Sequence, residues 1–208
     1  MTQSGTNETR RDLFGGAMTA TIPVEFSDVS DFRQVPDNQE VFADPRTDQS
    51  IIIEILELHE EASDADCARW HFENLADEND VQPGADYRQI SMVRPLANID
   101  APNVIPVEQS DDNVAGMLAI GTIRVAKYRQ GDAGGESVLN TVNLYVAVLR
   151  LKQFSADVLV SMNHPMAIGS QSAVQSEGAR ADPDVTKASK IFMSLLRSFR
   201  IVDSSLFG

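Results

Sequence analysis

The sequence contains few residues of the kinds that bind metals or form crosslinks. Of its 208 residues only Cys67 is a cysteine, and three scattered residues, His59, His71 and His164, are histidines. One thiol cannot form an internal disulfide bond, and these histidines do not have the spacing of zinc ligands. We therefore expect no metal site and no cofactor, in a chain that folds in a reducing compartment.

Long apolar runs are also missing. The longest, residues 114–126, is interrupted by Arg124 and is far shorter than the ~20 residues of a membrane helix. The first ten residues are polar, unlike the apolar core of a signal peptide, and position 2 is not the glycine that myristoylation requires. The sequence thus predicts a soluble intracellular protein without membrane contact.

Positive charge is scarce in the first part of the chain. Residues 1–80 contain 19 acidic residues and 5 arginines, whereas residues 81–208 contain 12 acidic and 12 basic residues, so the first part accounts for the net charge of −14. An acidic field disfavours binding to nucleic acid or anionic membranes and favours a basic protein partner. Four basic residues of the second part are separated by apolar positions, which is typical of solvated faces rather than of a nucleic-acid stripe: Arg150, Lys152, Arg197 and Arg200.

Alternating and β-branched segments predict strands that are joined mostly by short turns. They lie at residues 17–22, 39–43, 50–58, 88–93, 116–128, 142–152 and 158–163. Consecutive strands of this kind form a mostly antiparallel sheet, and two amphipathic helices must cover it, so the predicted fold class is α+β.

Capping residues mark the helices. Ser63 and Asp66 form a variant of the capping box before a helix that extends to about Ala76. Asp182 and Pro183 predict the start of a last helix, whose apolar residues 188–199 share one face. We expect residues 1–11 to be a disordered tail, residues 12–208 to be a single domain, and residues 164–181 to be a flexible loop within it.

Two motifs that could indicate an enzyme are weak. The glycines at 15–16 and 131–135 lack the Gly-Lys-Ser/Thr of a phosphate loop. Cys67 and His71 are spaced i, i+4 on a predicted helix, but no third orienting group accompanies them and Trp70 and Phe72 are adjacent. We therefore interpret this pair as core packing rather than as a nucleophile and its base.

Six strings of residues resemble one known family. They are dense over residues 12–60 and near the C-terminus: Leu13–Ala17, Asp28–Arg33, Val35–Phe42, Asp48–Glu57, Leu149–Asp157 and Val202–Phe207. On these strings the chain resembles the Ran guanine-nucleotide release factors, the Mog-type Ran-binding proteins. The resemblance implies a fold shared with the PsbP subunit of photosystem II, a sheet of about six mostly antiparallel strands flanked by helices.

The resemblance also implies a partner and an activity. It implies binding to the GTPase Ran, in the nucleus and cytoplasm, and release of its guanine nucleotide in support of transport between them. We expect a monomer without catalysis of its own, and a second Ran-binding protein as a further partner remains open. A carboxylate-based enzyme and a PsbP-like structural subunit are the alternatives. No nucleophile or histidine motif accompanies the acids of the first alternative, and no transit peptide is evident for the second.

Five carboxylates are the candidate Ran contacts. The resemblance makes Glu54 and Glu57 the leading pair, although from the strand pattern alone both could equally be half-exposed strand residues. It also favours Glu40, while Asp37 is divided between partner contact and turn formation. Asp28 is first a candidate helix cap and second a candidate contact.

Overall fold

The structure is a computed structural model that describes residues 7–105, 113–126, 138–170, 172 and 178–208. Two α-helices, ten strands and several 3₁₀ turns occur within these residues. In chain order they are β1 (Glu8–Leu13), η1 (Phe14–Gly16), β2 (Met18–Pro23), β3 (Ser27–Asp28), η2 (Val29–Asp31), β4 (Gln39–Asp44), β5 (Gln49–Glu57), α1 (Cys67–Glu78), β6 (Arg88–Pro95), β7 (Val114–Ala126), β8 (Leu139–Leu151), η4 (Lys152–Phe154), β9 (Ala156–Ala167), α3 (Val185–Ser198), β10 (Arg200–Ile201) and η5 (Ser204–Phe207).

The strands form two antiparallel sheets. The larger has seven strands in the order β3-β4-β5-β9-β8-β7-β6, and the smaller has three in the order β1-β2-β10. The α+β class and the mostly antiparallel sheet are therefore confirmed, but the strand count is higher than expected. The two-residue strand β3 is too short to give a sequence pattern, and the strand predicted at 17–22 pairs with β1 instead of joining the larger sheet.

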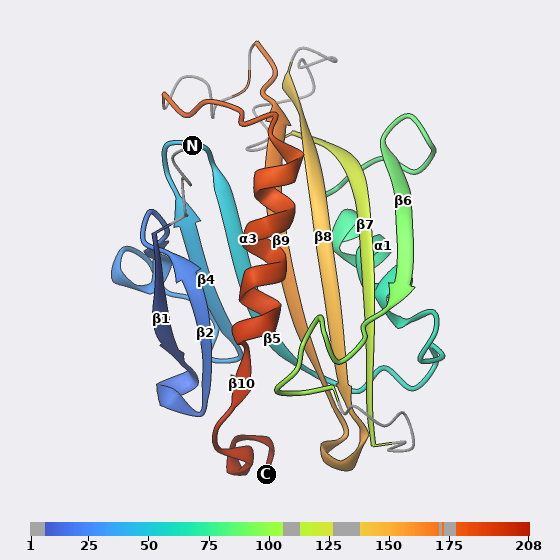
Figure 1. Ribbon diagram of the computed structural model, residues 1–208. Coiled ribbons are helices and arrows are strands. Elements are labelled where there is room, and N and C mark those ends of the chain that lie inside the picture. Colours follow the sequence, from blue (N-terminus) through green and yellow to red (C-terminus); the bar gives the residue numbers. More distant parts are fainter. Residues whose placement is uncertain (1–6, 106–112, 127–137, 171, 173–177) are drawn as a thin grey trace.

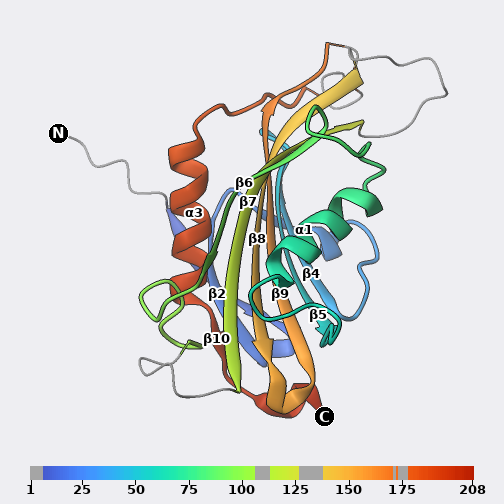
Figure 2. The ribbon, with the colours of Figure 1, turned by 90° about the vertical axis from the view of Figure 1, so that its right-hand side faces the viewer.

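The large sheet is covered on both faces. Figure 1 shows α3 crossing in front of β9, and Figure 2 shows the sheet between α3 on one side and α1 on the other. The small sheet lies on the α3 side, because α3 packs against β2 and their apolar residues share one core cluster. A second cluster fills the space between α1 and the central strands. The large sheet thus has an α3 face and an α1 face.

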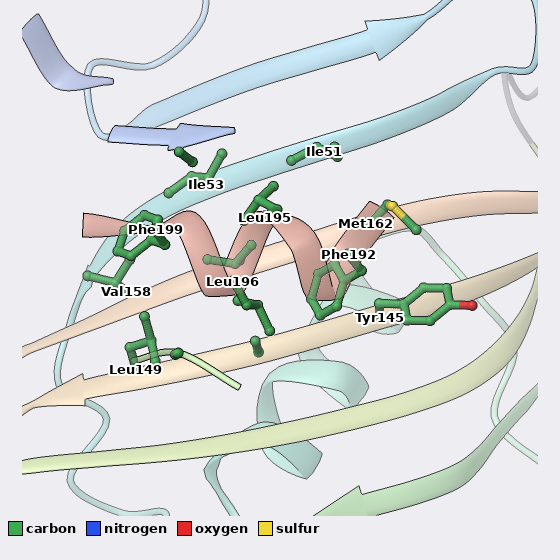
Figure 3. Packing of buried hydrophobic residues seen from close by; sticks show 14 of the residues in the cluster. Ile51, Ile53, Tyr145, Leu149, Val158, Met162, Phe192, Leu195, Leu196 and Phe199 are labelled. Atoms are coloured by element: carbon green, nitrogen blue, oxygen red, sulfur yellow. The ribbon is translucent and has the colours of Figure 1, made fainter. Parts of the chain in front are cut away.

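Helix α3 is fixed by its cap and by its apolar face. The Asp184 carboxylate accepts hydrogen bonds from the backbone N–H groups of Thr186 and Lys187, both at 3.0 Å. The predicted cap, Asp182, lies two residues too early and instead forms an ion pair with Lys187. The predicted apolar face is confirmed, since all its members are buried, and Figure 3 shows four of them over the sheet: Phe192, Leu195, Leu196 and Phe199.

Helix α1 packs its small and aromatic residues against β7 and β8. The predicted capping box is present, because Ser63 Oγ accepts the Asp66 N–H and donates to its carboxylate, although the helix itself begins at Cys67. Phe72 is fully buried, and a Cβ atom on Gly121 of β7 would lie only 2.6 Å from its ring. Glycine at this strand position therefore lets α1 approach the sheet.

Two segments that were expected to lack structure are partly strands. Residues 8–11 belong to β1, whose residues pair with β2 from Glu8 opposite Pro23 to Leu13 opposite Met18. Likewise, residues 164–167 are the end of β9, where His164 is fully buried. Residues 8–11 are polar, and residues 164–167 begin a stretch that as a whole is low in apolar residues, so neither segment has an alternating apolar pattern. Residues 1–6, 127–128, 171 and 173–177 lie outside the described residues.

Candidate functional site: an acidic groove beside helix α1

Glu54 lies on the α1 face of the large sheet. Residues of β5 alternate between the two faces, with Ile51 and Ile53 buried toward α3, so Glu54 points the other way. Its carboxylate accepts hydrogen bonds from Gln39 Nε2 at 2.7 Å and from Asn38 Nδ2 at 3.4 Å. The neighbouring strand therefore holds this half-buried carboxylate in place without neutralising its charge.

Glu57 is the last residue of β5 and is exposed. Because an isolated buried carboxylate is costly, the sequence pattern predicts that one of the two glutamates lies at a strand end, near a bulge or beside an interface. In the structure Glu57 lies at the strand end. Although strict alternation would separate Glu54 and Glu57, the end of β5 brings both to the wall of one groove.

The groove has a volume of about 240 Å³ and lies between α1 and the strands β5 and β9. Its sheet wall and floor come from the end of β5, the segment after it and Leu159 of β9, and its other wall comes from one side of α1. The lining residues are Glu54, Leu56, Glu57, His59, Trp70, His71, Asn74, Leu75, Glu78 and Leu159.

Asp28 and Glu40 lie on the opposite face of the sheet. Glu40 is opposite Ile53 in the β4–β5 pairing, so it points toward the small sheet, where its carboxylate accepts the backbone N–H of Phe14. Asp28 caps η2 by accepting the N–H of Ser30 at 2.8 Å, as predicted. Burial, reinforced by the nearby Asp28 charge, raises the pKa of Glu40 despite the Phe14 hydrogen bond. These two carboxylates have structural partners within the chain.

Asp37 occupies the turn before β4. The turn is closed by the backbone N–H of Gln39, which donates to the carbonyl of Pro36 at 2.9 Å. The Asp37 side chain is exposed, and no hydrogen bond to it is found within the described part of the chain. The turn lies beside Glu54, since the adjacent residue Asn38 contacts both Glu54 and the carbonyl of Ile55.

A buried ion pair connects strands β8 and β9 to the segment between β5 and α1. Arg150 of β8 is 3% exposed and forms a salt bridge to the fully buried Asp157 of β9, with 3.1 Å between Nε and Oδ1. The same guanidinium donates to the carbonyls of His59 and Ala62 in the segment between β5 and α1. Our expectation of a solvated Arg150 is therefore wrong. It lies in phase with Val146 and Val148 on the α1 face, where the segment before α1 covers it.

Asp157 also joins α1 to the pair. His71 Nε2 lies 3.5 Å from Asp157 Oδ2. Burial would raise the pKa of Asp157, but the hydrogen bonds from His71 and Arg150 outweigh it and hold that pKa below its usual value. Burial raises the pKa of Cys67 to about 12, so its thiol stays protonated at neutral pH. The interpretation of Cys67 and His71 as buried helix residues agrees with these contacts.

Sequence reasoning missed the helix wall of the groove. From the sequence we noted Trp70 only as a neighbour of the Cys67–His71 pair, yet 38% of its surface is exposed. Its spacing from Asn74 and Glu78, four and eight residues on, would have placed all three on one side of the helix. That side differs from the face of Phe72 and Ala76, which is the one the apolar pattern identifies.

Metal binding and membrane insertion are two further functions that the geometry of a chain can indicate. Over the described ranges, no group of three or more His, Cys, Asp or Glu side chains is placed to hold a metal ion. No helix in that part of the chain is long and apolar enough to cross a membrane.

Comparison with solved structures defines the class of fold. The crystal structure of the Ran-binding protein Mog1p of Saccharomyces cerevisiae superposes with a TM-score of 0.66 at 24% identity and covers 98% of this chain and 100% of its own. The solution structure of PsbP from the cyanobacterium Synechocystis has a TM-score of 0.51 at 12% identity, covering 97% and 96%. The chain thus has the fold that these two proteins share.

Sequence comparison identifies the family within that fold. The family model described as Ran-interacting Mog1 protein matches residues 11–165. The Ran guanine nucleotide release factor of Danio rerio is 37% identical over 95% of this chain and 99% of its own length, and the human protein of that name is 35% identical over 94% and 95%. The chain belongs to the family of Ran-interacting Mog1 proteins.

Proposed function

We propose that this protein binds the GTPase Ran and promotes release of its guanine nucleotide, in support of protein transport into the nucleus. The observation that carries the proposal is the pair Glu54 and Glu57 on one groove wall, in a chain whose relatives are named Ran guanine nucleotide release factors. The protein acts as a monomeric regulator in the nucleus and cytoplasm, without catalysis of its own.

Differential affinity is sufficient for such an activity. A small GTPase holds its nucleotide through backbone amides, a lysine on the phosphates and Mg²⁺. A protein that binds the empty state more tightly than the loaded state shifts the equilibrium toward release. Carboxylates suit this task, because they pair with basic groups that the phosphates leave and repel the phosphates themselves.

The five predicted contacts contribute in different ways to this proposal. Glu54 and Glu57 contact Ran directly, and the exposed Asp37 lies beside them on the β4 turn. Glu40 and Asp28 act on the other face, where they hold the turns at Phe14 and η2. Their contribution to Ran binding is therefore through local structure.

The proposal is tested by nucleotide release from purified Ran. Ran loaded with a fluorescent guanine nucleotide is mixed with excess unlabelled nucleotide, with or without stoichiometric protein. We expect faster loss of fluorescence with the protein and no production of free phosphate above that of Ran alone. A release trace that stoichiometric protein leaves unchanged would refute the proposed function.

A further inference from the structure

The aromatic rings of His59 and Trp70 line the acidic groove. Trp70 is the only tryptophan of the chain, and its ring stacks on the ring of His59 with centroids 3.7 Å apart. The buried His71 ring lies nearly perpendicular to it, with centroids 4.9 Å apart. Two neighbours thus fix the orientation of the indole while more than a third of it faces solvent. A large aromatic side chain that is held rigid and left open is typical of an interface anchor.

Part of the groove lining is apolar. Leu56 of β5, Leu159 of β9 and Leu75 of α1 line it together with the aromatic rings and the carboxylates. These side chains come from three elements that the Arg150–Asp157 pair and the helix packing hold together. The groove is therefore a fixed feature of the fold, with space for an unbranched aliphatic chain.

The walls of the groove are negatively charged. Glu54 and Glu57 lie on the sheet side and Glu78 on the helix side, where it accepts a hydrogen bond from Asn74 Nδ2 at 2.7 Å. No lysine or arginine lines the groove, and in the described part of the chain no salt bridge reaches these three carboxylates. Their charges are left for a partner to neutralise.

We propose that the groove receives one long cationic side chain of Ran, a lysine or an arginine, with Trp70 as its anchor. Such a side chain combines an aliphatic stem with a charged end, which matches a groove lined by three leucines, an indole and carboxylates. A cation close to an indole ring gains cation–π attraction in addition to its ion pairs. This inference rests on the proposed function, and it adds Trp70 and Glu78 to the binding residues.

The single tryptophan permits a direct test on the unmutated protein. Incorporation of 5-fluorotryptophan gives one ¹⁹F resonance, which reports on Trp70 alone. We expect this resonance to shift or broaden when unlabelled nucleotide-free Ran is added. A resonance that stays unchanged while Ran is demonstrably bound would overturn the groove proposal.

Substitutions give the second readout. Trp70→Ala should weaken Ran binding by about tenfold or more, as is common for buried aromatic anchors, whereas Trp70→Phe should retain most of the affinity. The matched control is Ile99→Ala, which truncates an apolar side chain that is 74% exposed in the segment bonded to α3. It should change affinity by no more than about twofold. Equal affinity of the Trp70→Ala and wild-type proteins would contradict the proposal.

Chemical modification of Ran identifies the side chain that enters. If a lysine enters, acetylation of Ran lysines should cancel the ¹⁹F change. If an arginine enters, the change should survive acetylation and be cancelled by butanedione. A change that survives both treatments overturns the cationic occupant. If the protein neither binds Ran nor releases its nucleotide, both the proposed function and this inference are wrong. If it binds Ran and releases the nucleotide but the Trp70 resonance does not change, only this inference is wrong.

Discussion

At the scale of single residues, the face of a strand decides what a carboxylate does. Glu40 and Glu54 lie on paired strands, opposite Ile53 and Gln39 respectively. Glu40 points to the small sheet and accepts the N–H of Phe14, whose backbone has the positive φ of 50° that is uncommon outside glycine. Glu54 points to the groove. A change at Glu40 should therefore act on stability, and a change at Glu54 on binding.

For Glu40→Ala we expect the free energy of unfolding to fall by about 1–3 kcal/mol, because the Phe14 N–H loses its acceptor in a partly buried place. Urea unfolding measures this, with Glu57→Ala as the exposed glutamate control that should change it little. Unchanged stability combined with lost Ran binding would show that the Glu40 carboxylate contacts Ran directly.

His164 makes stability depend on pH. It is fully buried, and its Nδ1 lies 2.6 Å from Gln49 Nε2. Burial lowers its pKa, although Asp182 and Asp184 oppose that effect while Lys187 adds to it. In the unfolded chain an ordinary histidine takes up a proton near pH 6.5. The unfolded state therefore binds more protons just below that pH, and stability must fall as the pH falls.

We expect His164→Gln to flatten this dependence between pH 7.5 and 5.5, because glutamine does not titrate. Urea midpoints at both pH values give the comparison, and His59→Gln serves as the control at a histidine that is not fully buried. The account of His164 fails if the wild-type midpoint shows no greater loss on acidification than that of His164→Gln.

At the scale of elements, one buried ion pair joins the β8–β9 hairpin to the segment before α1. Arg150 binds Asp157 and the carbonyls of His59 and Ala62, and Asp157 also accepts the N–H of His59 at 3.3 Å. Removing one member leaves the other charge buried without its partner, which costs far more than the pair itself contributes.

We therefore expect Asp157→Ala to lower the free energy of unfolding by about 3–5 kcal/mol. The double variant Arg150→Leu/Asp157→Leu should recover only part of this loss, because the two carbonyls still lack their donor. Denaturant unfolding of both variants is the measurement. Full recovery in the double variant would mean that Arg150 does not hold the segment before α1.

The elements also show what the sequence can and cannot predict. The apolar face of α3 and the alternation of β5 could be predicted from the sequence, because their buried side chains recur at regular spacing. Strand β1 could not be predicted, since its backbone pairing with β2 leaves no pattern in its polar side chains. The end of β9 could not be predicted either, because its residues 164–167 begin a long stretch that is low in apolar residues. Glu54 and Glu57 could be chosen from their strand and from the family strings. Trp70 and Glu78 could not, because the groove forms only when α1 lies beside β5.

At the scale of the whole molecule, the uneven charge of the sequence becomes an uneven charge of the fold. Residues 1–80, which carry the entire net charge of −14, form the strands from β1 to β5 and helix α1. Both walls of the acidic groove therefore belong to the acidic part of the chain, and only Leu159 of its lining comes from the neutral part.

This charge distribution predicts a salt-dependent association with Ran. Long-range attraction between an acidic surface and a basic partner raises mainly the rate of association. The distance over which it acts shrinks from about 10 Å at 0.1 M salt to about 3 Å at 1 M. Stopped-flow association rates should fall steeply over this range, while dissociation rates change less. An association rate that is independent of salt would indicate an apolar interface instead.

The central claim is that the acidic pair at the end of β5 binds Ran. Its most direct test is a Ran pull-down with Glu54→Lys and Glu57→Lys, with melting temperatures measured in parallel. Because each change reverses a charge at the interface, we expect both variants to lose Ran and Glu57→Lys to melt like wild type. The charge-matched control Asp86→Lys, at an exposed position away from the groove, should retain Ran. Glu54→Lys and Glu57→Lys proteins that melt normally and still retain Ran would contradict the claim.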